Sequence, residues 1–122
     1  MEGLAPHRVL VVDDNQEAAN LVAKLLRLLG QTAMPAYDGP SALHFASEFK
    51  PDIVFLDLVM PNMDGFTVAR RLRELHGLNP PKIVALTAFG QPAFLEAALA
   101  AGFDGHITKP ASAEELAKAL SI

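Results

Sequence analysis

Residues 51–65 read PDIVFLDLVMPNMDG, an apolar run that ends in an acid and leads into a loop containing proline, asparagine and glycine. The run IVFL at 53–56 contains no polar residue, and VLVV at 9–12 and IVAL at 83–86 have the same character. Such strands suit a parallel sheet covered by helices on both sides, because neither face of the sheet then meets water. These runs therefore predict an α/β fold built on a parallel sheet.

Short apolar runs rich in branched residues occur five times, with starts 23, 21, 30 and 22 residues apart. They are Val9–Val12, Thr32–Tyr37, Ile53–Leu56, Ile83–Leu86 and Gly105–Thr108. The segments between them have helical spacing, with apolar and polar positions on opposite helix faces. This alternation predicts a doubly wound sheet of five parallel strands with five helices.

Proline and glycine positions agree with this pattern. Pro35 lies inside the second run, and because proline cannot donate to a strand ladder, we expect that strand at an edge of the sheet. The strand order 2-1-3-4-5 places it there. Gly30 fits the position after a helix end, Pro40 and Pro92 fit first helical turns, and residues 112–115 read as a capping box.

Length and composition indicate one globular domain. The chain has 122 residues and a mass of 13.0 kDa, so we expect residues 1–122 to form a single domain. Hydrophobic residues make up 51% and charged residues 20% of the chain, which argues against disorder. The absence of cysteine excludes disulfide frameworks, cysteinyl zinc sites and thiol catalysis.

Charge and hydropathy limit the partners of the chain. The formal net charge of −4 argues against nucleic-acid binding driven by phosphate neutralisation. No apolar run approaches the roughly 18–20 residues that a membrane span needs, and residues 1–8 contain no secretory hydrophobic segment. We therefore expect a soluble, cytoplasmic protein whose domain contacts neither nucleic acid nor membrane.

Polar residues follow four of the five predicted strands. Asp13 and Asp14 follow the first strand, Asp57 the third, Thr87 the fourth and Lys109 the fifth. Ligands of doubly wound sheets bind outside the carboxyl ends of the strands, so these side chains are expected to form one site.

Three carboxylates at one edge repel each other unless positive charge lies between them, and a divalent cation together with Lys109 can supply that charge. Oxygen ligands without histidine or cysteine suit Mg²⁺, which binds through one or two carboxylates and keeps several waters. A dedicated Ca²⁺ site is less favoured because the twelve-residue EF-hand spacing is absent.

A carboxylate beside a metal ion can act as a nucleophile and form an acyl phosphate, and Asp57 is the best candidate for that role. Phosphoryl transfer needs in-line placement and positive charge on the phosphoryl oxygens, which Mg²⁺ and Lys109 can provide. The Thr87 hydroxyl can bond a phosphoryl oxygen only after transfer, and this contact can act as a switch.

The sequence resembles the receiver domain of response regulators in two-component and phosphorelay signalling. Four motifs carry the resemblance: VLVVDDN at 9–15, PDIVFLDLVMPNMDG at 51–65, ALTA at 85–88 and ITKP at 107–110. The resemblance covers nearly the whole chain and implies a flavodoxin-like fold. It also implies a phosphoprotein that accepts or relays a signal and is not a turnover enzyme, with at most self-phosphorylation and slow autodephosphorylation.

The resemblance implies a role for each matching residue. Asp57 is the phosphoacceptor, which takes the group from a phosphohistidine on a sensor histidine kinase or a histidine phosphotransfer domain. Asp14 binds Mg²⁺ directly, Asp13 acts mainly through water, and the backbone carbonyl of Val59 completes the protein ligands. Lys109 contacts the phosphoryl group.

Two further family features concern the strand ends. The resemblance implies that Thr87 is the switch hydroxyl and that the Lys109–Pro110 peptide is cis. Family members commonly have tyrosine or phenylalanine three residues before the lysine, whereas this chain has His106. Val59 and Phe89 cannot orient an attacking water, which predicts slow self-dephosphorylation.

The context GFDGHITKP at 102–110 is similar to receivers of hybrid sensor histidine kinases, which predicts a phosphorelay module. We also expect a partner or homodimer contact through the predicted helix at 92–101, in which Glu96 is the one charged residue. By resemblance, the first helix is a second docking face for the kinase partner.

Alternative interpretations remain for these motifs. Asp13 and Asp14 could cap the first helix, and Asp57 could belong to an ordinary loop in which Asp64 caps the next helix. A pseudo-receiver that binds proteins without phosphorylation is the main functional alternative. A phosphohydrolase of the haloacid dehalogenase type is disfavoured, because that family has a second acid at the position of Val59. A flavodoxin is disfavoured because its phosphate loop is rich in Ser, Thr and Gly, whereas this chain has Asp13 and Asp14 there.

Overall fold

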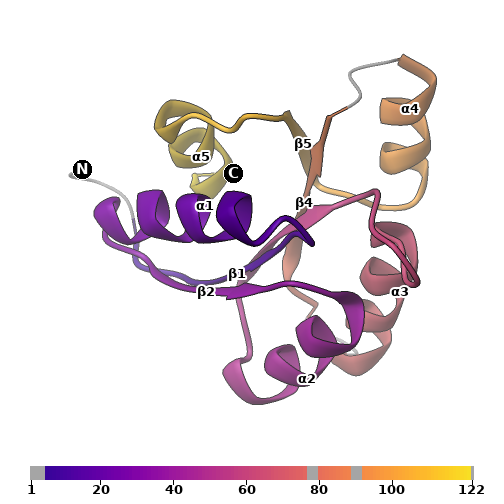
Figure 1. The fold of residues 1–122 in the computed structure, drawn as a ribbon, viewed down its shortest axis with the longest axis horizontal. Helices are drawn as coiled ribbons and strands as arrows, with labels where there is room; N and C mark the ends of the chain where they lie inside the picture. Colours follow the sequence, from indigo (N-terminus) through magenta and orange to yellow (C-terminus); the bar gives the residue numbers. More distant parts are fainter. Residues whose placement is uncertain (1–4, 77–79, 89–91, 122) are drawn as a thin grey trace.

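The computed structural model describes residues 5–76, 80–88 and 92–121. Strands and helices alternate along the chain (Figure 1). In chain order they are β1 (Arg8–Val12), α1 (Gln16–Leu28), β2 (Thr32–Ala36), α2 (Gly39–Phe49), β3 (Ile53–Asp57), α3 (Gly65–His76), β4 (Lys82–Thr87), α4 (Pro92–Ala100), β5 (Gly105–Thr108) and α5 (Ala113–Leu120).

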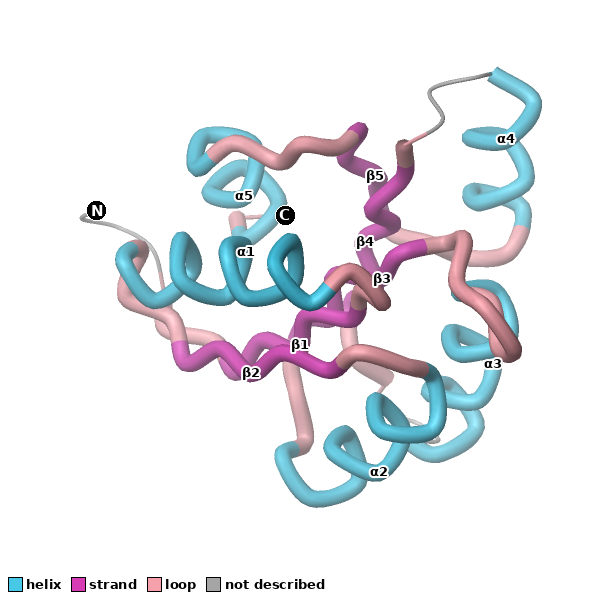
Figure 2. The backbone as a smooth tube through the Cα atoms, viewed as in Figure 1, coloured by secondary structure: helices cyan, strands magenta, loops and turns pink. Residues whose placement is uncertain are grey.

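The strands form one parallel sheet in the order β2-β1-β3-β4-β5. Helices α1 and α5 pack on one face of this sheet, and α2, α3 and α4 pack on the other (Figure 2). Strand β2 lies at an edge and carries Pro35 opposite Val11 of β1. The predicted flavodoxin-like architecture, its strand order and the edge position of β2 are confirmed.

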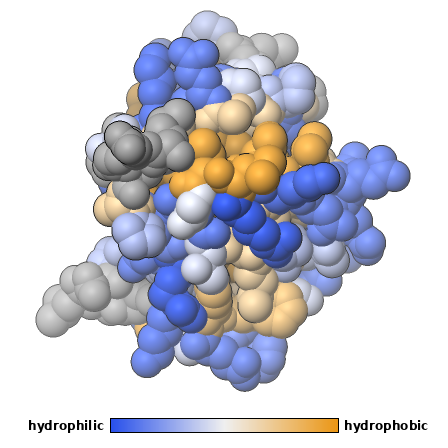
Figure 3. Space-filling model, turned by 90° about the vertical axis from the view of Figure 1, so that its left-hand side faces the viewer, coloured by the Kyte–Doolittle hydropathy of each residue, from blue (hydrophilic) through white to orange (hydrophobic). Residues whose placement is uncertain are grey.

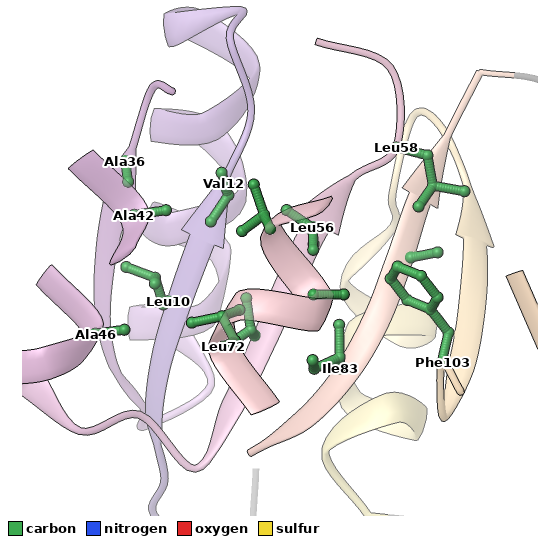
Figure 4. Packing of buried hydrophobic residues seen from close by; sticks show 14 of the residues in the cluster. Leu10, Val12, Ala36, Ala42, Ala46, Leu56, Leu58, Leu72, Ile83 and Phe103 are labelled. Atoms are coloured by element: carbon green, nitrogen blue, oxygen red, sulfur yellow. The ribbon is translucent and has the colours of Figure 1, made fainter. Parts of the chain in front are cut away.

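Two apolar cores explain why the central strands have no polar interruption. Leu10 and Leu56 point toward α2 and α3, where they meet Leu72 in a fully buried cluster (Figure 4). Their strand neighbours, such as Val11 and Phe55, point toward α1 and α5 instead. Because each large side chain contributes about 1.5–3 kcal/mol when fully buried, the two faces together hold the sheet between its helix layers.

The helix ends follow from local chemistry. Gly30 has a φ of 84° directly after the α1 C-terminus, a conformation that suits glycine. Asp38 caps α2 by accepting from the Ser41 N–H, with Pro40 in the first turn. The capping box at the start of α5 is present, with Ser112 and Glu115 as its reciprocal pair. These three sequence predictions are confirmed.

The element bounds differ from the predictions by one residue at six places, two of which are the earlier starts of β1 at Arg8 and of β4 at Lys82. Strand β2 ends before Tyr37, and α4 ends before residue 101, which lies in a turn. Strands β3 and β4 each extend one residue further than predicted, so that Asp57 and Thr87 are their last residues. In the part of the chain that the structure describes, no helix is both long and apolar enough to span a membrane.

Candidate functional site

The carboxyl ends of the four neighbouring strands bring the predicted site residues to one edge of the sheet. Asp13 directly follows β1, Asp57 ends β3, Thr87 ends β4 and Lys109 directly follows β5. Parallel strands all end at the same edge, so residues up to 96 positions apart in the chain meet there. The structure thus assembles the cluster that the strand ends predicted.

Three carboxylates form the acidic part of this site. One oxygen from each of Asp13, Asp14 and Asp57 lies within 4.8 Å of the others. Asp13 and Asp57 are buried, with 2% and 3% of their surface exposed, whereas Asp14 is exposed. The cluster therefore has a buried floor of two carboxylates and a third at its solvent side.

Lys109 supplies positive charge to the buried pair. Its Nζ lies 2.9 Å from Asp13 Oδ2 and 3.3 Å from Asp57 Oδ2. The Lys109 backbone N–H donates to the Thr87 carbonyl at 2.8 Å, which fixes the start of the following loop beside the end of β4. The Lys109–Pro110 peptide is cis, as predicted.

Asp13 has both carboxylate oxygens in use. Oδ1 accepts from the Asn15 N–H at 3.0 Å, while Oδ2 pairs with Lys109. The cap of α1 is Asn15, whose side chain accepts from the Ala18 N–H at 3.1 Å. The interpretation of Asp13 and Asp14 as helix caps is therefore wrong, because the following residue fills that position.

Burial of Asp57 changes its acidity. Desolvation raises the pKa of its carboxyl group to about 7, although the Lys109 ammonium opposes this rise and the Asp13 charge adds to it. Its Oδ1 also accepts from the Val59 N–H at 3.2 Å. A cation bound beside Asp57 would therefore favour the charged form of its carboxyl group.

The pKa of the Lys109 ammonium is also raised, but here burial opposes the rise. Burial alone would lower its pKa, but the hydrogen bond to Asp13 and the charges of Asp57 and Asp13 outweigh burial and raise it. Lys109 consequently stays charged at neutral pH. The site keeps a fixed cation facing the acidic pair.

The loop after β3 closes on the backbone of Asp57. The Leu58 N–H donates to the Leu86 carbonyl at 3.2 Å, and the Gly65 N–H donates to the Leu58 carbonyl at 3.0 Å. A Cβ atom on Gly65 would lie 2.4 Å from the Asp57 carbonyl oxygen, so only glycine allows α3 to begin this close. Asp64 caps α3 by accepting from the Thr67 N–H, a contact that the alternative interpretation of this loop included.

Val59, two residues after Asp57, has 52% of its surface exposed. Its side chain therefore faces solvent at the mouth of the site, while its backbone lies against Asp57. The predicted use of its backbone carbonyl as a Mg²⁺ ligand stays a prediction. Phe89, which stands beside Val59 in the prediction of slow self-dephosphorylation, lies outside the described residues.

The predicted switch residues lie on the two last strands. Thr87 is 1% exposed and lies opposite Thr108 in the β4–β5 ladder. His106 lies opposite Ala85, two residues before Thr87, and its side chain is exposed. A histidine on the edge strand is therefore close in register to Thr87 and open to solvent.

The donor set of the site fits a hard divalent cation. It consists of the carboxylate oxygens of Asp13, Asp14 and Asp57, and hard oxygen donors of this kind suit Mg²⁺. Three carboxylates facing one ammonium also leave an excess of negative charge, which a cation would offset. Asp14 is the carboxylate that is both exposed and free of the Lys109 pair, so it is the best placed for direct ligation.

Sequence reasoning missed two residues that support the site. Asn15 was not identified as the cap that also anchors Asp13 through its backbone, although an asparagine before a helical pattern is a known signal. Gly65 was not identified as a close-contact residue, because its role depends on how α3 approaches β3 in space.

Comparison with curated proteins gives two relatives that are transcriptional regulators by name. The probable transcriptional regulatory protein TcrX of Mycobacterium tuberculosis is 40% identical over 111 residues, which cover 91% of this chain and 47% of that protein. The DNA-binding dual master transcriptional regulator RpaA of Synechocystis is 35% identical over 109 residues, covering 89% of this chain and 45% of the relative. The chain thus spans less than half the length of these relatives.

Solved structures show the same fold. The chemotaxis protein CheY4 of Vibrio cholerae matches with a TM-score of 0.84 at 30% identity, covering 96% of this chain and 98% of that one. The receiver domain of a Francisella response regulator matches with a TM-score of 0.83 at 27% identity, covering 94% and 93% of the two chains.

These relatives do not test the predicted likeness to receivers of hybrid sensor kinases, which stays a prediction. The family described as response regulator receiver domain matches residues 9–121, which include every predicted site residue. The chain belongs to the response regulator receiver domain family.

Proposed function

We propose that this domain accepts a phosphoryl group on Asp57 from a phosphohistidine of a sensor histidine kinase or a histidine phosphotransfer domain. The observation that carries the proposal is the position of Lys109 Nζ, 2.9 Å from Asp13 and 3.3 Å from Asp57. This arrangement presents a buried carboxylate next to a fixed cation, as phosphoryl transfer to a carboxylate requires.

The transfer step forms one P–O bond and breaks one P–N bond. A carboxylate oxygen of Asp57 attacks phosphorus, the P–N bond of the phosphohistidine breaks, and its electron pair returns to the imidazole nitrogen. The product is an acyl phosphate on Asp57 and a free histidine on the partner. Lys109 neutralises phosphoryl oxygens during the transfer, so we propose it as the second catalytic residue.

We propose that Asp14, Asp57 and the backbone carbonyl of Val59 hold Mg²⁺, with Asp13 acting mainly through water. When bound, the ion supplies positive charge that offsets the repulsion between the carboxylates and the incoming phosphoryl group. The indirect role of Asp13 follows the family resemblance, and its buried carboxylate is held in place by Lys109 and the Asn15 N–H.

Thr87 is proposed as the switch residue. It ends β4 at the same edge as Asp57, and its hydroxyl would bond a phosphoryl oxygen once the group is attached. We include His106 in the switch by its register beside Ala85. The domain in this proposal changes its surface on phosphorylation and has no turnover activity beyond self-phosphorylation and slow loss of the group.

Two surfaces are proposed for partners. Helix α4 exposes Leu99 with 59% of its surface open, and it is proposed as a homodimer or partner contact. Helix α1 exposes Leu21 and Leu28, at 56% and 72%, and is proposed as the kinase-docking face. On the side of the molecule shown in Figure 3, hydrophobic residues gather in one patch beside hydrophilic ones.

The transfer proposal is tested by intact-mass spectrometry after incubation with acetyl phosphate and Mg²⁺. We expect one phosphoryl adduct that is base-labile, requires Mg²⁺ and is absent from Asp57→Asn. An adduct that persists in Asp57→Asn would contradict the assignment of the acceptor. A chain that binds Mg²⁺ but takes no phosphoryl group, even from a phosphohistidine donor, would favour the pseudo-receiver.

A further inference from the structure

Gly39, the first residue of α2, is buried against the loop that follows Asp57. A Cβ atom added to Gly39 would lie 2.6 Å from Sδ, 2.9 Å from Cβ and 3.0 Å from Cγ of Met63. Real Cβ atoms essentially never approach another heavy atom within 3.0 Å, so any other residue at position 39 must displace Met63.

The glycine at position 39 is explained by this contact and not by backbone conformation. The glycines with positive φ among the described residues are Gly30 and Gly102, and Gly39 is not one of them. The close approach of Met63 is therefore the feature that requires glycine here.

Met63 reaches α2 because the loop turns sharply just before it. Asn62 has a φ of 71°, and the Met63 N–H donates to the Pro61 carbonyl at 2.8 Å. Met63 then packs, partly buried, against the core between the sheet and α2. Met60 is 7% exposed in the same core, so two methionines anchor the loop on either side of its turn.

The far end of the loop is tied to Asp57 itself. The Gly65 N–H donates to the Leu58 carbonyl at 3.0 Å. A Cβ atom on Gly65 would clash with the Asp57 carbonyl oxygen, so the two backbones lie in close contact. Only one residue separates Met63 from this tie. A displacement of the Met63 backbone would therefore reach the peptide of Asp57 and Leu58 through one intervening residue.

We infer that Gly39 and Met63 are positioning residues for the phosphoacceptor loop: their contact sets where the Val59 backbone lies relative to the Asp57 carboxylate. This inference rests on the proposed function, since Asp57 and the Val59 carbonyl are the groups being positioned. Neither Gly39 nor Met63 contacts the reacting groups, so both act through the loop.

The test measures Mg²⁺ affinity by calorimetry and the rate of phosphorylation by acetyl phosphate in the same variants. Gly39→Ala is expected to weaken Mg²⁺ binding and slow phosphorylation by about tenfold, because misplacement by less than 1 Å is costly in such sites. Met63→Leu keeps a similar volume and is expected to remain near wild type. Met63→Ala removes the anchor and is expected to weaken Mg²⁺ binding.

Gly30→Ala is the matched control. It strains a left-handed residue at which an added methyl would meet no atom within 4 Å, so it destabilises the fold without touching the loop. It is expected to lower the melting temperature and leave Mg²⁺ affinity unchanged. The double variant Gly39→Ala/Met63→Ala is expected to be no worse than Gly39→Ala, because both changes act on one contact.

The outcomes separate this inference from the proposed function. Wild-type affinity and rate in Gly39→Ala would overturn the inference alone, as would losses that add in the double variant or an equal loss of affinity in Gly30→Ala. A wild-type chain that neither binds Mg²⁺ nor accepts a phosphoryl group would overturn the proposed function, and the inference with it.

Discussion

Lys109 Nζ lies closer to Asp13 than to Asp57, at 2.9 Å against 3.3 Å. Without a phosphoryl group, the ammonium is thus held mainly by a carboxylate that is not the proposed acceptor. The proposed acceptor, Asp57, keeps one oxygen toward Lys109 and the other toward the Val59 N–H. Asp13 consequently fixes the lysine in place before the reaction, and this pre-organisation limits what must move during transfer.

Removal of the Lys109 charge is expected to change Mg²⁺ affinity and the rate of phosphorylation in opposite directions. Lys109→Ala should bind Mg²⁺ several-fold more tightly, because the three carboxylates lose their competing cation. The same variant should accept a phosphoryl group on the order of a hundredfold more slowly. Calorimetry and mass spectrometry measure the two effects, with Lys82→Ala at the opposite end of β4 as the control. Weaker Mg²⁺ binding in Lys109→Ala would contradict this account.

The raised pKa of Asp57 predicts a pH-dependent stability in Mg²⁺-free protein. The pKa rises from 3.8 to about 7 on folding, mainly through burial, so the folded state holds the proton more tightly than the unfolded chain does. The free energy of unfolding should therefore fall as the pH rises from about 4 to 7. Asp57→Asn should be more stable than wild type by about 1–3 kcal/mol at pH 8.

Denaturant unfolding of both proteins in EDTA at pH 5 and pH 8 tests this prediction. The advantage of Asp57→Asn should shrink at pH 5, where the wild-type carboxyl group is largely protonated in the fold. Mg²⁺ at pH 8 should stabilise wild type more than Asp57→Asn. A difference between the two proteins that does not change with pH would show that Asp57 does not titrate in this range.

Substitutions of the neighbouring residues Asp14 and Asn15 are expected to distinguish Mg²⁺ binding from the capping of α1. Asn15→Ala should destabilise the fold by about 1 kcal/mol through loss of the α1 cap. Asp14→Asn should leave stability in EDTA unchanged or higher, because it removes one of three mutually repelling carboxylates. Its Mg²⁺ affinity should fall by about tenfold or more. Chemical unfolding and calorimetry compare the pair, and full Mg²⁺ affinity in Asp14→Asn would exclude it as a ligand.

Val59→Asn is expected to shorten the lifetime of the acyl phosphate several-fold. The side chain is 52% exposed at the mouth of the site, so an amide there can orient a water toward the phosphoryl group where valine cannot. Stability should change by less than about 0.5 kcal/mol, as for other exposed positions. The decay of the adduct is followed by mass spectrometry after removal of the donor, and an unchanged decay rate would refute the explanation.

The sequence contained enough information for the sheet because each strand carries its signal locally. Uninterrupted apolar runs identify β1, β3 and β4, and Pro35 identifies β2 as an edge strand. The site followed from one further rule, that parallel strands end at a common edge, which brings Asp57 and Lys109 together.

The sequence pattern could not predict the contacts between side chains of different elements. The choice of Asp13 over Asp57 as the closer partner of Lys109 depends on side-chain positions that no spacing encodes. The contact of Gly39 with Met63 joins residues that are 24 positions apart, on a helix and a loop whose distance is set by packing. The cap of α1 was ambiguous because Asp14 and Asn15 are both good capping residues, and only the backbone path selects one.

Pro35 has a consequence for how this domain meets other copies of itself. An edge strand with free N–H and C=O groups can recruit a strand from another molecule and begin an intermolecular sheet. Strand β2 carries a proline in its middle, so an incoming chain lacks one of the donors it would need for continuous pairing. The flank of the sheet farthest from β5 thus resists the addition of a further strand.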